Sequence, residues 1–271
     1  MSSKVFKANF VGAKLKFHPV LSGFPIASLD KNMDLKQRIF NFSGKEVKIS
    51  PTIYGRFTIY DLRLIFLILG ELMNAQEESL EISNRVNLKV AAYFLAIGKG
   101  SGGNQYREIL DVIRRLATTS IEIKSKDTKY KNYKNFSLLN DTEIVSLGST
   151  DNLLDVTVTI SDVLYSAVQG KSVLTLNPIY LRLTSPIEMR LFEYFDMRTG
   201  VSGFHTIGLK KLHQISGSLS PFKSFSYEIR SLLNSDSKKY IQLKKAFQFE
   251  LYKGRKANLY VKRLIPKRRS K

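Results

Sequence analysis

One order of predicted elements occurs twice along the chain, and this repeat constrains the fold more than any other feature of the sequence. In each copy a Gly-Ser pair, Gly100–Ser101 or Gly217–Ser218, precedes an amphipathic helix that is the third helix of its copy. A strand and a basic hairpin follow each of these helices. Three helices followed by an antiparallel hairpin are the order of a winged helix, which is a helix-turn-helix with a β-hairpin. The sequence therefore predicts an α+β fold of two tandem winged-helix domains.

The elements of the first copy are predicted from the spacing of its apolar residues. A short strand is expected over 47–49, and a buried helix that is apolar nearly all round is expected over 58–73, with Thr58 as its N-cap. Helical spacing also marks 88–97 and 103–117 as the second and third helices. Alternating apolar residues then predict strands in the segments "TTSIEIKS", "FSLLNDTEIVSLG" and "LLDVTVTI".

The second copy carries clearer helix signals. A helix is expected over 185–199, because Ser185 is a good N-cap and a proline follows it in the first turn. A short helix over 209–216 ends before a glycine, and a third helix is expected over 220–234. The segment 239–264 then predicts a strand, a basic turn and a second strand.

These elements divide the chain into four predicted parts. They are an N-terminal extension over 1–35, a first winged-helix domain over 36–176, a second winged-helix domain over 177–264, and a basic tail over 265–271.

Gly98, Gly100 and Gly103 match the G-x-G-x-x-G spacing of a dinucleotide-binding turn. Such a turn needs a strand before the glycines and a further αβ unit after them. Here a predicted helix precedes them, and a strand and a polar hairpin follow, so a glycine-rich connection between two helices is favoured. The "GKS" at 170–172 is not a P-loop either, because Tyr165 stands where that motif requires glycine.

The distribution of charge favours a polyanionic partner. The formal net charge is +20, and the segment 205–271 alone holds 17 Lys and Arg against Glu228, Asp236 and Glu250, a net +14. Nucleic acid is the favoured polyanion, since each phosphate contact releases counterions. The alternatives are a lysine-rich surface without a specific partner and an anionic membrane. A membrane partner is not supported, because no strongly amphipathic helix combines the Lys and Arg residues with exposed bulky apolar residues.

Composition excludes several kinds of site. The chain has no cysteine and only three histidines, His18, His205 and His213, so no disulfide, metal or cofactor is expected. The most apolar run, Leu62–Leu69, is too short to cross a bilayer and contains Arg63. We see no secretory signal, and the expected location is the cytoplasm.

The predicted helix 220–234 has the composition of a recognition helix. Its apolar residues share one face, so that face is expected to pack inward. The opposite face could hydrogen-bond base edges or phosphates, although a solvated helix face is the alternative. The inward residues are Phe222, Phe225, Ile229, Leu232 and Leu233, and the outward residues are Lys223, Ser224, Tyr227, Arg230, Ser231 and Asn234.

Other basic residues are expected to flank this helix and contact the DNA backbone. In the second domain they are Lys210, Lys211, Lys244, Lys245, Lys253, Arg255 and Lys256, and the tail adds Lys267, Arg268, Arg269 and Lys271.

The first domain is expected to contact the backbone, or a second copy of the chain, rather than to read sequence. Its third helix exposes Asn104 and the two arginines Arg107 and Arg115, but also Glu108 and Asp111, which would repel phosphate. Its predicted hairpin carries Lys124, Lys126, Lys129, Lys131 and Lys134 with Tyr130 and Tyr133, of which Lys129 and Lys131 are candidate DNA contacts.

From about residue 47 to 264 the chain resembles the replication initiator protein A family of plasmid initiators. The segments "VKISPTIYGRFTIYDLRLIFLI", "GKGSGGNQYREILDVIRRLATTSIEI" and "LTLNPIYLRLTSPIEMRLFEY" carry the resemblance, and "SDVLYSAV" is the other specific match. The sequence departs from the family at Ala117, Thr118 and Thr119, where many members have Arg and Gly, which puts backbone contact by the first domain in doubt.

The resemblance implies binding to repeated sites at a plasmid origin and help in opening an AT-rich segment. It also implies recruitment of the host initiator ATPase and the replicative helicase, and a homodimer that represses its own promoter.

Two other functions are also compatible with parts of this sequence. A transcriptional regulator on the same fold would bind DNA without a role in origin melting. A rolling-circle nicking enzyme needs two metal-binding histidines near a nucleophilic tyrosine, but His205 and His213 are eight residues apart and bracket a helix. We therefore expect a non-enzymatic protein with no catalytic residues, which binds double-stranded DNA.

Overall fold

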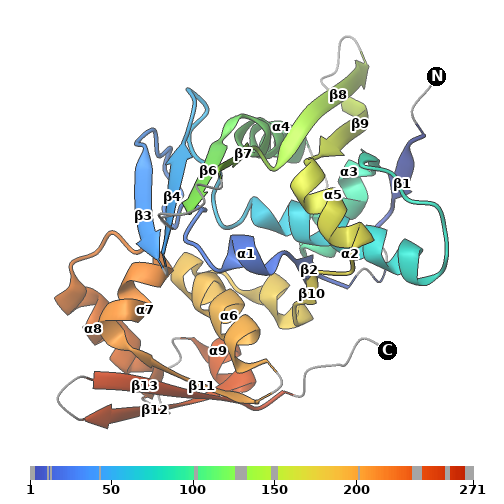
Figure 1. Ribbon diagram of the computed structural model, residues 1–271. Coiled ribbons are helices and arrows are strands. Elements are labelled where there is room, and N and C mark those ends of the chain that lie inside the picture. The colour runs from blue at the N-terminus through green and yellow to red at the C-terminus, as the bar shows by residue number, and fades with distance from the viewer. Residues whose placement is uncertain are drawn as a thin grey trace.

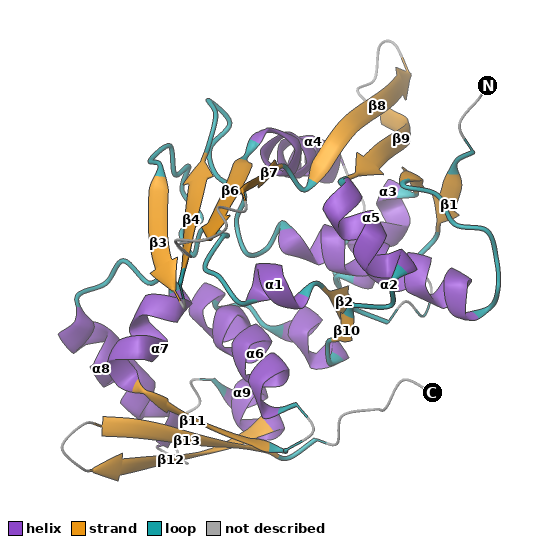
Figure 2. Ribbon diagram, viewed as in Figure 1, coloured by secondary structure: helices purple, strands orange, loops and turns teal. Residues whose placement is uncertain are grey.

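Helices and strands are mixed along the whole chain, so the α+β class predicted from the sequence is confirmed (Figures 1 and 2). The structure is a computed structural model. It describes residues 4–10, 12, 14–42, 44–100, 103–125, 133–147, 152–200, 202–233, 240–253 and 257–265.

The first of two similar sets of elements, which we call the first unit, begins with a helix that is buried on almost every side. Leu64, Leu67 and Leu69 are among its fully covered residues. Gly70 lies in the same helix, where the backbone of Lys14 approaches so closely that a Cβ would lie 1.7 Å from the Lys14 carbonyl oxygen. The elements of the first unit are α2 (Leu62–Glu77), β5 (Arg85–Leu88), α3 (Val90–Ala96), α4 (Gly103–Thr118), β8 (Leu139–Leu147) and β9 (Asn152–Ile160).

The second unit has the same succession of a helix, a strand, two helices and two strands. A 3-10 turn and a short helix are added before its last two strands. The elements of the second unit are α6 (Pro186–Thr199), β11 (Phe204–Gly208), α7 (Leu209–Ser216), α8 (Phe222–Arg230), η2 (Ser231–Leu233), α9 (Ile241–Ala246), β12 (Phe247–Lys253) and β13 (Ala257–Arg263).

The two units also share one strand order. In the first unit β9 lies between β5 and β8, and in the second unit β13 lies between β11 and β12, with antiparallel pairing throughout. The last strand of each unit is therefore central in its sheet. In the second unit the pairs include His205 with Val261 and Phe249 with Val261, which places Val261 in the core.

A separate four-stranded sheet combines two strands that precede α2 with a hairpin inserted into the first unit between α4 and β8. Its strand order is β3-β4-β6-β7, and all its pairs are antiparallel. The strands are β3 (Arg38–Phe42), β4 (Lys45–Ser50), β6 (Ser120–Ser125) and β7 (Tyr133–Phe136). The basic hairpin β6–β7 therefore does not pair with β5, and the hairpin that joins the sheet of the first unit is β8–β9.

The N-terminal segment is built into both units. The strand β1 (Phe6–Ala8) pairs in parallel with β5, and β2 (Lys16–Phe17) pairs with β10 (Leu174–Thr175). The helix α1 (Pro19–Ser22) packs against α6 of the second unit (Figure 1). The remaining elements are α5 (Asp162–Gln169) and the 3-10 helix η1 (Pro178–Arg182).

Several predicted elements are confirmed and others are wrong. The helices α4, α6 and α7 agree with their predicted ranges within a residue or two. The predicted helix 58–73 instead begins at Leu62, because the Asp61 carboxylate accepts the backbone N–H of Thr58 at 2.7 Å before the first turn. Leu88 ends a strand rather than starting a helix, and the strand β11 was not predicted.

A buried polar network connects the second unit to the N-terminal segment. The Arg190 guanidinium, 3% exposed on α6, donates through Nη1 to the Ser22 carbonyl at 2.7 Å and through Nη2 to the Ile215 carbonyl at 3.0 Å. Nη1 also lies 3.3 Å from Oε2 of Glu193, whose Oε1 accepts the Tyr180 hydroxyl at 2.5 Å. Burial raises the pKa of the Glu193 carboxyl, and Arg190 opposes that rise.

Replacement of Arg190 by alanine is expected to lower the free energy of unfolding by about 3–5 kcal/mol, because Glu193 would keep a buried charge without its cation. Urea unfolding of the full chain measures this loss. The matched control is Arg198→Ala on the same helix, where the side chain is exposed and the expected loss is below about 1 kcal/mol. Equal losses in the two variants would contradict a central role for Arg190.

Candidate nucleic-acid interface

The helices α7 and α8 are joined by a turn that Gly217 fixes. Its φ of +71° is a left-handed conformation that favours glycine, and a Cβ there would lie 2.5 Å from Cβ of Pro25. The His213 ring then joins the two helices. Its Nε2 is 2.9 Å from the Ser220 carbonyl oxygen, and its ring centroid is 4.7 Å from that of Phe225.

The apolar side of α8 packs inward, but over fewer residues than predicted. Phe225, Ile229 and Leu232 are buried, whereas Phe222 is 37% exposed and Leu233 is 38% exposed. The regular helix ends at Arg230 and continues as a 3-10 turn, so the predicted spacing of about 100° per residue does not extend to Leu233. The prediction that all five apolar residues of the segment are buried is therefore wrong for two of them.

The opposite side of α8 faces outward. Lys223, Ser224, Tyr227 and Arg230 are exposed, and Tyr227 reaches 81%. Ser231 is half-buried and its hydroxyl donates to the Glu228 carbonyl at 2.6 Å, so it is less available to a ligand. Asn234 lies outside the described residues.

The flanking basic residues fall on three elements. Lys210 and Lys211 are exposed on α7. The segment around Lys244 and Lys245 is the helix α9, so the strand predicted there is wrong. This helix follows Tyr240, whose φ is +60°, and the Glu188 carboxylate of α6 accepts the backbone N–H of Leu243 at 3.1 Å.

Of these α9 lysines, Lys245 is exposed and Lys244 is half-buried. Lys253 ends β12, while Arg255, Lys256 and the tail from 266 onward lie outside the described residues.

The outer face of the second unit's sheet carries aromatic side chains that the sequence analysis did not single out. The rings of Phe204 and Tyr260 stack at 6.0 Å between centroids, and Tyr252 meets Tyr260 edge-on at 6.1 Å. The exposed Lys262 lies on the same face, since it pairs with Phe204 across the ladder. In the sequence, the alternation of the apolar Leu259 and Val261 with Tyr260 and Lys262 could have predicted this outer face.

In the first unit, Arg115 has an internal partner. Its Nε and Nη2 lie 2.8 and 2.9 Å from the two carboxylate oxygens of Asp61, which is buried at the start of α2. We therefore leave Arg115 out of the candidate interface, because this bidentate pair uses the donors that a phosphate would need. Arg107 is exposed on the same helix.

The two acids that were expected to repel phosphate from α4 are both paired. Glu108 is 2.5 Å from Nζ of Lys99, and Asp111 is 3.5 Å from Nη1 of Arg114. The Asn104 side chain is not described. In the β6–β7 hairpin Lys124 and Lys134 are exposed, while Lys126, Lys129, Tyr130 and Lys131 lie outside the described residues and the Tyr133 side chain is not described.

The histidines are held in separate places. His205 is half-buried with its Nε2 3.2 Å from the Tyr194 hydroxyl, and burial lowers its pKa, with Arg198 and Lys211 adding to the effect. Burial also lowers the pKa of His18, and Lys134 adds to it. Within the described residues, no group of three or more His, Asp or Glu side chains could hold a metal ion. Among the described helices, none is both long enough and apolar enough to cross a membrane.

Replacement of Phe225 by alanine is expected to lower the free energy of unfolding by about 3–5 kcal/mol, since it empties a fully buried site. Tyr227→Ala, two residues away on the exposed side, should change it by less than about 0.5 kcal/mol. Thermal or urea unfolding of both variants checks the orientation of α8. A large loss for Tyr227→Ala would contradict it.

Known proteins resemble this chain in sequence or in fold. A putative replication protein of Wigglesworthia glossinidia brevipalpis is 25% identical over 216 residues, covering 79% of this chain and 78% of the relative. The crystal structure of domains 2 and 3 of RctB matches with a TM-score of 0.65 and 13% identity, over 92% of this chain and 99% of that one. A second crystal structure of RctB domains 2 and 3 matches with a TM-score of 0.57 and 15% identity, over 90% of this chain and 96% of that one. The family model of replication initiator protein A matches residues 20–242, and the chain therefore belongs to that family.

Proposed function

We propose that the first and second units are winged helices that bind double-stranded DNA. The pairs α3–α4 and α7–α8 are the helix-turn-helix elements, and the hairpins β8–β9 and β12–β13 are the wings. The shared succession of elements and the shared strand order support this assignment. The similarity in fold to domains 2 and 3 of RctB is consistent with it.

The second unit reads the sequence, with α8 in the major groove. The observation that carries this proposal is the outward, cationic side of α8, where Tyr227 and Arg230 are exposed while Phe225 is buried behind them. The Arg230 guanidinium donates two hydrogen bonds to one guanine, and Lys223 and Ser224 contact phosphates.

Basic residues around α8 hold the DNA backbone. The proposed backbone contacts of the second unit are Lys210, Lys211, Lys244, Lys245, Lys253, Arg255 and Lys256. The first unit contributes Arg107, Lys129 and Lys131 as backbone contacts, or forms a homodimer through the same region. A net charge of +14 over 205–271 supplies the attraction.

The biological role that fits is a plasmid replication initiator in the cytoplasm. It binds repeated sites at an origin, promotes opening of an AT-rich segment, and recruits the host initiator ATPase and replicative helicase. It acts without catalysis of its own. Membership of the replication initiator protein A family and the relative named as a putative replication protein support the role in replication.

Footprinting of the full chain on the DNA that surrounds its gene tests this role. We expect protection of several direct repeats in one orientation, next to an AT-rich stretch that becomes sensitive to a single-strand probe. Protection of one palindrome without any such sensitivity would instead indicate a transcriptional regulator. A sample that protects no site would contradict both.

Replacement of Arg230 by alanine is expected to weaken binding to the specific site by about 1–3 kcal/mol and to leave binding to random DNA nearly unchanged. Arg230→Lys is the matched control, because it keeps the positive charge but loses the two-point geometry. We expect it to weaken the specific complex as well, in fluorescence anisotropy at fixed salt. A lysine variant that binds like the wild type would mean that Arg230 contacts phosphate only.

A further inference from the structure

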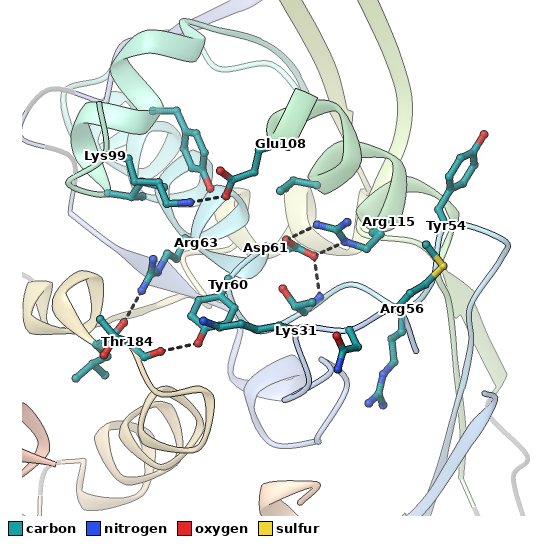
Figure 3. A pocket seen from close by; sticks show the side chains of 17 residues that line it. Lys31, Tyr54, Arg56, Tyr60, Asp61, Arg63, Lys99, Glu108, Arg115 and Thr184 are labelled. Carbon is teal, nitrogen blue, oxygen red and sulfur yellow. Dashed lines mark hydrogen bonds and ion pairs between the residues drawn. The ribbon is translucent and has the colours of Figure 1, made fainter. Parts of the chain in front are cut away.

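A cavity of about 560 Å³ lies away from α8, between parts of the chain that are distant in sequence (Figure 3). Its wall is formed by the N-terminal segment, the start of α2, the helices α3 and α4, and the segment after η1 that leads into α6. Leu183 and Thr184 bring that last segment to the cavity, so an occupant would touch both the first unit and the segment that leads into the second.

The cavity contains more positive than negative side chains. Its cations are Lys31, Arg56, Arg63, Lys99 and Arg115, and its acids are Asp61 and Glu108. Both acids are already paired, Asp61 with Arg115 and Glu108 with Lys99. Arg56 is paired with Asp34 at 3.0 Å. Among the described residues, Lys31 and Arg63 form no ion pair with a carboxylate.

Arg63 is buried without enough acceptors. It is 7% exposed, and its Nη2 donates to the Leu183 carbonyl at 2.6 Å, a neutral acceptor. Its Nε has no hydrogen-bond partner among the described residues. An unsatisfied donor of a buried cation is costly, and a negative charge held nearby would lower that cost.

Both of these cations, Lys31 and Arg63, lie close to the ring of Tyr60. Nζ of Lys31 lies over its ring at 5.5 Å from the centroid, and the Arg63 guanidinium carbon lies over it at 5.4 Å. The Tyr60 hydroxyl donates to the Thr184 carbonyl at 2.5 Å, which holds the ring in place (Figure 3). The remaining lining is mostly apolar or aromatic, namely Met33, Tyr54, Tyr93, Ile97, Val112 and Leu183, and it also includes the polar Asn32, Thr58 and Thr184.

We propose that this cavity binds a small organic phosphate monoester, with its phosphate at Lys31 and Arg63 and its organic part against the apolar lining. A phosphate monoester carries about −1.5 to −2 at neutral pH and so balances two cations, whereas a single carboxylate balances one. The volume is within the range of small-molecule pockets, roughly 300–1,000 Å³. The site is independent of the proposed DNA-reading face.

Calorimetric titration of the full chain with ribose 5-phosphate and with adenosine 5′-monophosphate tests the proposal. Saturable binding of either is expected, and the two arms separate a sugar phosphate from a nucleotide. Adenosine without phosphate should not bind, and succinate should bind at least about tenfold more weakly than the phosphate, since its charges are too far apart for one site.

Variants of the exposed Lys31 locate the ligand without endangering the fold. Lys31→Gln is expected to weaken phosphate binding by about tenfold or more, and Lys31→Arg to keep it within about threefold. Lys36→Gln is the matched control, because Lys36 is exposed on the same segment outside the cavity and should bind like the wild type.

No saturable binding of either phosphate, equal binding of succinate, or an unchanged affinity in Lys31→Gln would overturn the proposal. Binding only of an oligonucleotide, and of neither small phosphate, would overturn it too. Origin DNA binding, measured on the same samples, is expected to be unchanged in Lys31→Gln. A failure here is thereby distinguished from a failure of the proposed DNA-binding function.

Discussion

The buried guanidinium of Arg190 is the contact on which the arrangement of the second unit depends. It donates to the Ser22 carbonyl of the N-terminal segment and to the Ile215 carbonyl near the end of α7, and it pairs with Glu193 on its own helix. Each carbonyl is at the end of a helix, where backbone acceptors lack partners within the helix. One side chain thus satisfies acceptors from two segments and fixes α7, and through α7 it fixes the position of α8.

Local signals predicted much of the secondary structure, and nonlocal contacts account for the errors. Capping residues and apolar spacing sufficed for α4, α6 and α7. The helix α9 could not be predicted, because its first turn is stabilised by Glu188 from α6 rather than by a residue of its own segment. The separate sheet β3-β4-β6-β7 pairs Lys45 with Ser125, and no pattern in the sequence reveals a pairing over that distance.

How well each candidate site could be predicted depended on whether it is built from local or long-range contacts. The outward side of α8 depends on a single helical period, so Lys223, Tyr227 and Arg230 were correctly expected on the surface. The pairing of Arg115 with Asp61 could not be predicted, because the two residues are 54 positions apart in the sequence. The cavity beside Tyr60 draws on segments from across the chain, and the one signal for it was an arginine inside an apolar helix.

The close approach of Gly217 to Pro25 connects the second unit to the N-terminal segment. The tight bend between α7 and α8 rests on the ring of Pro25, at the far end of the sequence. The C-terminal third alone would lack both the Pro25 ring beside the turn and the Ser22 carbonyl that accepts from Arg190. A design that transplants α7 and α8 onto another scaffold would therefore have to include the segment that contains Ser22 and Pro25.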